Sequence, residues 1–311
     1  MDVIPLFFVL GVAARLIRSD LKVPGAVYEL LAIYLLLAIG LKGGVELARQ
    51  DVLSLLPAVG LVLLMGIALP LLAFPLLKLR FARADAASIA AHYGSVSVVT
   101  YAVCATALTT RQLDYEAYFP IFVAILEVPA ILIGVLLARI GTGEAGKPTK
   151  WGPLAHEIFS SKSVVLLIGG IAIGWIGGPT SIEPLVPLFY TLFKGALCLF
   201  LLEMGLVAAS RLDDLRRAGA FLVAFGILFP LVGAAVGLAC GWLLGFTPGG
   251  VALLMTLGAS ASYIAAPAAM RIAVPEANPT LSIGAALGIT FPFNIMVGIP
   301  LYIAIAERLR S

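Results

Sequence analysis

The chain has 311 residues, of which 61% are hydrophobic and only 12% are charged, and its formal net charge is +3. Because soluble domains carry about 25% charged residues, this composition excludes an ordinary water-soluble protein. The small net charge says nothing about nucleic acid, and no nucleic-acid partner is expected. The apolar residues exceed what one globular core can bury, so a lipid bilayer must surround much of the chain.

Ten apolar segments follow one another along the chain. Each is predicted to cross the bilayer as a helix, since about 20 apolar residues span its hydrocarbon core. A hydrophilic linker, residues 141–162, separates a first repeat, 1–140, from a second, 163–311. The first and sixth segments are short or interrupted by Gly. The ten segments are residues 3–17, 24–47, 53–77, 84–109, 117–137, 163–176, 185–209, 218–244, 249–270 and 281–306.

The distribution of basic residues predicts the orientation of these segments. Cytoplasmic loops of membrane proteins are enriched in Lys and Arg. Most of the 20 Lys and Arg residues fall in cytoplasmic loops if the N-terminus lies outside. We therefore expect a multi-pass protein of the cell's inner (plasma) membrane, with both termini outside and the linker inside.

Short motifs recur between the two halves. The Gly-Leu pair at 40–41 returns 165 residues later at 205–206, and the Ser-x-Ser motif at 95–97 returns at the same offset at 260–262. An odd number of spans in each half turns the second copy upside down, as in many secondary transporters. The sequence thus predicts an all-α integral membrane protein, with ten transmembrane helices in a five-plus-five inverted repeat.

Segments four and nine are predicted to be discontinuous helices. Gly and Pro weaken a helix in mid-span, and a broken helix exposes backbone N–H groups at a positive dipole end that favours an anion. The alternative is helix packing, because small residues allow close approach and Ser or Thr can bond to their own helix. The candidate anion-binding residues are Gly94, Ser95, Ser97, Thr100, Gly258, Ser260 and Ser262.

Charged and polar residues within the spans mark further candidates, because such residues are costly in lipid. Glu127, before Pro129, is predicted either to serve a cation or proton or to form a structural pair. Asn294 is a candidate polar wall of the site. Glu29 and Lys194 lie 165 residues apart and are predicted to form a structural pair. No enzyme motif is present, and no cofactor is expected beyond a possible sodium ion.

The run from Ser262 to Pro279, with its Ala-Asn-Pro ending, resembles the sodium-dependent bicarbonate transporter family of cyanobacteria, as do residues 39–44, 105–110 and 192–195. The resemblance implies a homotrimer in which segments one, two, six and seven form a scaffold around a mobile core. It also implies an anion between segments four and nine with sodium nearby, and a PII-like cytoplasmic regulator.

Four positions differ from the family pattern. Tyr263 stands where the family commonly has Asp, Val98-Val99 where it has Gly-Ser, and Glu127 where it has Asp. The change to Glu127 is mild because the carboxylate is kept, whereas the changes at Tyr263 and Val98-Val99 remove an acid and hydroxyl oxygen atoms, which sodium prefers as ligands. The phenolic oxygen of Tyr263 therefore joins Glu127 and Asn294 as a candidate cation ligand.

The leading interpretation is a secondary active transporter for sodium-dependent bicarbonate symport by elevator-like alternating access. A second hypothesis is a carrier of another small anion, coupled to sodium or, through Glu127 and His92, to protons. A third is a membrane scaffold or receptor that transports nothing, in which the paired Ser residues serve only in packing.

Overall fold

The computed structural model describes residues 3–140, 151–211 and 219–308, and these contain helices and no strand. Eight helices are long and apolar enough to cross a membrane, which confirms an all-helical, multi-span protein. The apolar helices Ile4–Leu16 and Pro248–Ala259 are shorter. The eight are Gly25–Leu47, Val52–Leu77, Arg83–Thr110, Phe119–Arg139, Lys162–Leu185, Phe193–Ser210, Ala220–Leu243 and Pro279–Arg308.

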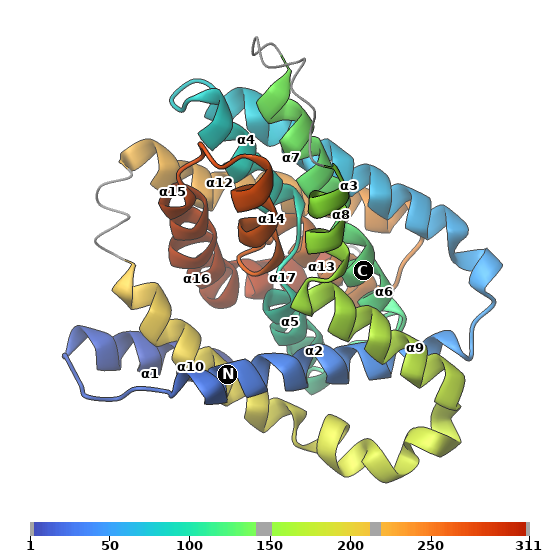
Figure 1. The fold of residues 1–311 in the computed structure, drawn as a ribbon. Helices are drawn as coiled ribbons and strands as arrows, with labels where there is room; N and C mark the ends of the chain where they lie inside the picture. The colour runs from blue at the N-terminus through green and yellow to red at the C-terminus, as the bar shows by residue number, and fades with distance from the viewer. Residues whose placement is uncertain (1–2, 141–150, 212–218, 309–311) are drawn as a thin grey trace.

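The helices form two groups, a scaffold along one side of the molecule and a core that holds the broken helices (Figure 1). The scaffold consists of α1 (Ile4–Leu16), α2 (Gly25–Leu47), α9 (Lys162–Ile182) and α10 (Phe193–Ser210). The core contains α3 (Leu56–Leu77), α4 (Arg83–Gly94), α5 (Val98–Thr110), α6 (Phe119–Leu126), α7 (Pro129–Arg139), α12 (Ala220–Leu243), α13 (Pro248–Ala259), α14 (Ala265–Ala273), α15 (Pro279–Ala285), α16 (Phe291–Phe293) and α17 (Ile299–Arg308).

Two spans are interrupted where the sequence places Ser-x-Ser. Helix α4 ends at Gly94 and α5 begins at Val98. In the second half, α13 ends at Ala259 and α14 begins at Ala265. Helices α4 and α13 are both 12 residues long and begin at positions 165 residues apart. The interruptions therefore recur at the offset of the sequence motifs.

The sixth segment is longer than predicted. It was expected to stop at residue 176, but α9 continues to Ile182, with a kink at Gly178, whose φ is +63°. The predicted end at residue 176 therefore lies close to this kink, and helical structure resumes beyond it. The predicted linker contains a helix, α8 (Trp151–Phe159). Linker residues 141–150 and residues 212–218 lie outside the described residues.

Glycines set the contacts within the scaffold, where α1 packs on α10 and α2 packs on α9. A Cβ atom at Gly205 would collide with the carbonyl oxygen of Phe8, and one at Gly44 with that of Ile171. The backbones of each pair therefore touch, which is how membrane helices pack without a hydrophobic driving force.

Gly205→Ala should destabilise the protein by about 1–3 kcal/mol, because the new methyl group meets a backbone oxygen that can move away only if the two helices separate. The control is Gly60→Ala in α3, where nothing lies within 4 Å of the added carbon. Thermal unfolding in detergent should show a lower midpoint for Gly205→Ala only. Equal midpoints for the two variants would contradict the close contact.

Candidate functional site

The two helix interruptions cross and share hydrogen bonds. The Ser262 N–H donates to the carbonyl oxygen of His92 at 2.8 Å. The Ser97 N–H donates to Oγ of Ser260 at 3.0 Å. Each interruption thus supplies acceptors for backbone N–H groups of the other, where a bilayer offers no water to replace them.

Most of the predicted anion-binding hydroxyls cap the half-helices. Oγ of Ser97 accepts from the Thr100 N–H at 3.2 Å, and Oγ of Ser262 accepts from the Ala266 N–H at 3.3 Å. Oγ of Ser260 donates to the Leu257 carbonyl at 2.9 Å. These side chains are buried. The structure brings the Ser residues together at the crossing, but their hydroxyls are engaged with the protein.

Gly94 and Gly258 lie at helix contacts beside the crossing. A Cβ atom at Gly94 would collide with Pro70 of α3, and one at Gly258 with the carbonyl oxygen of Gly233 in α12. These two glycines let each half-helix pack closely against the span that precedes it in the chain. This is the helix-packing role that the sequence analysis gave as the alternative to anion binding.

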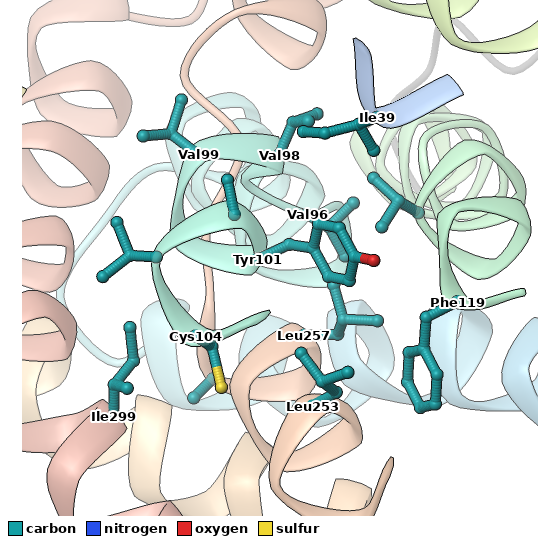
Figure 2. Close-up of a cluster of buried hydrophobic side chains, with 14 of the residues drawn as sticks. Ile39, Val96, Val98, Val99, Tyr101, Cys104, Phe119, Leu253, Leu257 and Ile299 are labelled. Carbon is teal, nitrogen blue, oxygen red and sulfur yellow. The ribbon is translucent and has the colours of Figure 1, made fainter. Parts of the chain in front are cut away.

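The N-terminal ends of α5 and α14 meet at a small gap that faces the scaffold. Val98 and Val99 of α5 and Ile264 before α14 line one side, and Ile39 of α2 and Phe200 of α10 line the other. Figure 2 shows Val98 and Val99 at the start of α5, with Ile39 near Val98. All its side chains are apolar, and its volume of about 10 Å³ holds at most about one water molecule.

The surface of this gap is entirely apolar, and the positive charge beside it comes from the two helix ends, where the Thr100 and Ala266 N–H groups are already bonded to Ser97 and Ser262. The first N–H groups of a helix have no partner within the helix and carry a partial positive charge. Two such ends converge here. Sequence reasoning noted Val98 and Val99 as departures from the family pattern but missed that they and Ile264 line a gap between the helix ends. Apolar walls keep water away and strengthen the attraction between an anion and the helix ends.

The candidate cation-binding residues flank the opposite, negative ends of the half-helices. Glu127 is 2% exposed and accepts a hydrogen bond at 3.4 Å from Ser95, which follows α4. Nδ2 of Asn294 donates to the Ala259 carbonyl, the last of α13, at 2.8 Å. Oδ1 of Asn294 accepts from the Tyr302 hydroxyl at 2.9 Å. Glu127 and Asn294 therefore occupy comparable places at the two interruptions.

Tyr263 takes a different place. Its ring packs edge-on against Phe291, with centroids 5.5 Å apart. Its hydroxyl lies beside Ser97 but makes no hydrogen bond of ordinary geometry within the described residues. The phenolic oxygen is thus buried at the crossing with its donor and acceptor capacity unused. Among the described residues, no three His, Cys, Asp or Glu side chains cluster as a metal site.

The predicted pair of Glu29 and Lys194 is wrong. Glu29 forms an ion pair with Lys162 at the start of α9, and Lys194 donates to Oγ1 of Thr110 at 3.3 Å. The reason is that α2 packs along α9, so the two helix starts meet. Lys194 instead lines a cavity of about 480 Å³ with Lys42, about 20 Å along α2 from Glu29.

Ser260→Ala should lower the stability by about 1–3 kcal/mol, because the buried N–H of Ser97 loses its acceptor. Ser210→Ala, which removes an exposed hydroxyl bonded to the Val207 carbonyl, is the control. Unfolding in detergent measures both variants. A Ser260→Ala protein as stable as its control would mean that the crossing bond contributes nothing.

Comparison with known proteins agrees with a membrane protein that has several spans. A family model described as the Na+-dependent bicarbonate transporter superfamily matches residues 4–307. No curated protein matches the chain. The match confirms the resemblance seen in the sequence and indicates a transporter rather than an enzyme. The chain is a multi-span membrane protein that belongs to the Na+-dependent bicarbonate transporter superfamily.

Proposed function

We propose that the protein is a secondary active transporter that carries bicarbonate or a similar small anion together with sodium. The observation that carries this proposal is the meeting of two positive helix ends, those of α5 and α14, at a gap bounded by the scaffold. Backbone N–H groups at such ends bind anions without a charged side chain. In this proposal the Ser residues hold the helix ends in place rather than bind the anion.

Elevator-like movement is supported by how the groups of helices contact each other. The interrupted spans are joined by the hydrogen bonds of Ser97 and Ser262 and so move as one body. The gap between them and α2 and α10 has only apolar side chains on both sides. Apolar surfaces can slide past one another at this gap, so movement that turns the site to each side breaks only polar contacts elsewhere on the boundary, such as that of Lys194 with Thr110.

An inverted repeat of residues 1–140 and 163–311 is part of the proposal. Exchange of the halves converts the contact of α1 with α10 into that of α9 with α2, and both contacts exist. The residue after α4, Ser95, has φ −88° and ψ 173°, and its counterpart after α13, Ser260, has φ −83° and ψ 166°. Ten spans then put both termini on the same side, which the basic residues assign to the outside.

Sodium would bind near the negative helix ends. Glu127 supplies a buried carboxylate, and Asn294 and Tyr263 supply further oxygen atoms at the crossing. No basic side chain lies within ion-pair distance of Glu127 among the described residues, so a cation or a proton must neutralise it. Proton coupling is the second candidate because Glu127 can take either role. The homotrimer and the PII-like regulator remain predictions from the family resemblance.

Val98→Phe should reduce transport by roughly tenfold or more, because its ring would fill the gap and deny the anion at least one charge-assisted hydrogen bond. Val232→Phe is the matched control, since Val232 in α12 is 44% exposed and faces away from the core. Uptake of labelled bicarbonate into proteoliposomes under a sodium gradient measures both. No uptake by the unchanged protein under any gradient would refute transport, and full activity of Val98→Phe would refute the site.

Glu127→Gln should remove the dependence of uptake on the cation gradient, because the amide has the carboxylate's shape without its charge. Glu203→Gln, in the scaffold helix α10, is the control. Loss of the stimulation by sodium in Glu127→Gln alone supports sodium coupling. Uptake that follows a pH gradient, ignores sodium and is lost in the same variant would favour proton coupling instead.

A further inference from the structure

The carboxylate of Glu127 lies where the core meets the scaffold. Glu127 directly follows α6, which packs against α9 of the scaffold. From the core, Ser95 donates a hydrogen bond to this carboxylate at 3.4 Å. From the scaffold, Ser163 in the first turn of α9 places its Oγ beside the same carboxylate. Glu127 is therefore a buried ionisable group in contact with both parts of the molecule.

The hydroxyl of Ser163 has no other polar neighbour to satisfy it. The side chain is fully buried, and its Oγ makes no hydrogen bond of ordinary geometry within the described residues. A buried hydroxyl without a partner is costly, and rotation about its C–O bond is enough to aim its hydrogen at a neighbouring carboxylate. Glu127 is the acceptor that lies beside it.

The backbone of α9 adds positive charge at this point. The first N–H groups of a helix have no partner within the helix and carry a partial positive charge. Helix α9 begins at Lys162, so Ser163 belongs to the turn that carries this charge, and the N-cap residue, Ser161, makes no side-chain hydrogen bond to it. The scaffold therefore offers a hydroxyl and a positive helix end to an ionised Glu127.

The core does not offer Glu127 the same compensation. Ser95 directly follows α4, so the carboxylate lies near the negative C-terminal end of that helix, which disfavours its charge. Movement of the core away from α9 would leave an ionised Glu127 buried without its positive neighbour, which is costly. A cation or a proton on the carboxylate removes that cost.

We propose that Ser163 and the first turn of α9 form a latch that holds the core against the scaffold while Glu127 is ionised and has no cation bound. A sodium ion at Glu127 cancels its charge and weakens the contact, so the core becomes free to move. The positive helix end repels cations, which makes Ser163 a positioning residue rather than a cation ligand. The latch rests on the proposed function and gives it a rule, namely that the core does not move without its cation.

The test is a sodium titration of the full chain in detergent, with choline replacing sodium at constant ionic strength. Sodium that binds the folded protein raises its thermal unfolding midpoint, and the concentration at which the rise begins reports the affinity. In Ser163→Ala the rise should begin at roughly tenfold less sodium, because one charge-assisted hydrogen bond no longer competes for Glu127. Ser160→Ala, which removes an exposed hydroxyl bonded to the His156 carbonyl, should titrate like the unchanged protein.

The two roles that Ser163 could have predict changes of opposite sign. A rise that begins at more sodium in Ser163→Ala would make Ser163 a cation ligand and overturn the latch. An unchanged titration would show that Ser163 does not act on Glu127. No rise in the unchanged protein would also overturn the latch, because sodium would then have no means to release it.

Transport supplies a second measurement. In proteoliposomes without sodium, Ser163→Ala should take up labelled bicarbonate faster than the unchanged protein, while uptake under saturating sodium stays the same. A purely structural role would lower both rates, and an unchanged sodium-free rate would contradict the latch. Absence of uptake by the unchanged protein would refute the proposed function, but the titration in detergent would still decide whether Ser163 acts on Glu127, so the two failures are distinguishable.

Discussion

The hydrogen bonds between the two interrupted spans are the constraint on which the rest of the structure depends. A helix broken within a bilayer leaves N–H and C=O groups that lipid cannot satisfy. Here each interruption partners the other, through Ser262 and the His92 carbonyl and through Ser97 and Ser260. The crossing brings the positive ends of α5 and α14 together, so the requirement that stabilises the fold also creates a place for an anion.

The contacts between helices within the scaffold differ from the contacts between the scaffold and the interrupted spans. Within the scaffold, glycines such as Gly205 and Gly44 bring backbones into direct contact, and any separation would cost that packing. Between the scaffold and the interrupted spans lie the apolar side chains of Val98, Ile39 and their neighbours. The boundary also carries a hydrogen bond from Lys194 to Thr110 and a close contact of Gly43 with Pro120, so any sliding of the core has to break these two contacts.

Sequence patterns predicted the position of the candidate site better than the roles of the residues in it. The Ser-x-Ser motifs correctly marked both interruptions, because Gly beside several hydroxyl side chains weakens a helix in mid-span. Their hydroxyls proved to cap half-helices, a use that depends on where each chain turns and that spacing alone does not reveal. The pair of Glu29 and Lys194 failed for a similar reason, since equivalent positions in two repeats need not be neighbours.

The sequence by itself determined that the protein lies in a membrane, that it is helical, and where two of its spans break. These properties follow from composition and local chemistry. Long apolar segments are stable in a lipid bilayer, and Gly, Ser and Pro weaken a helix. Only the tertiary structure decided which groups meet across the interruptions, that Val98 and Val99 line the gap, and that Ser163 lies beside Glu127. Those contacts join residues far apart in the chain, and their geometry depends on how the helices pack against one another.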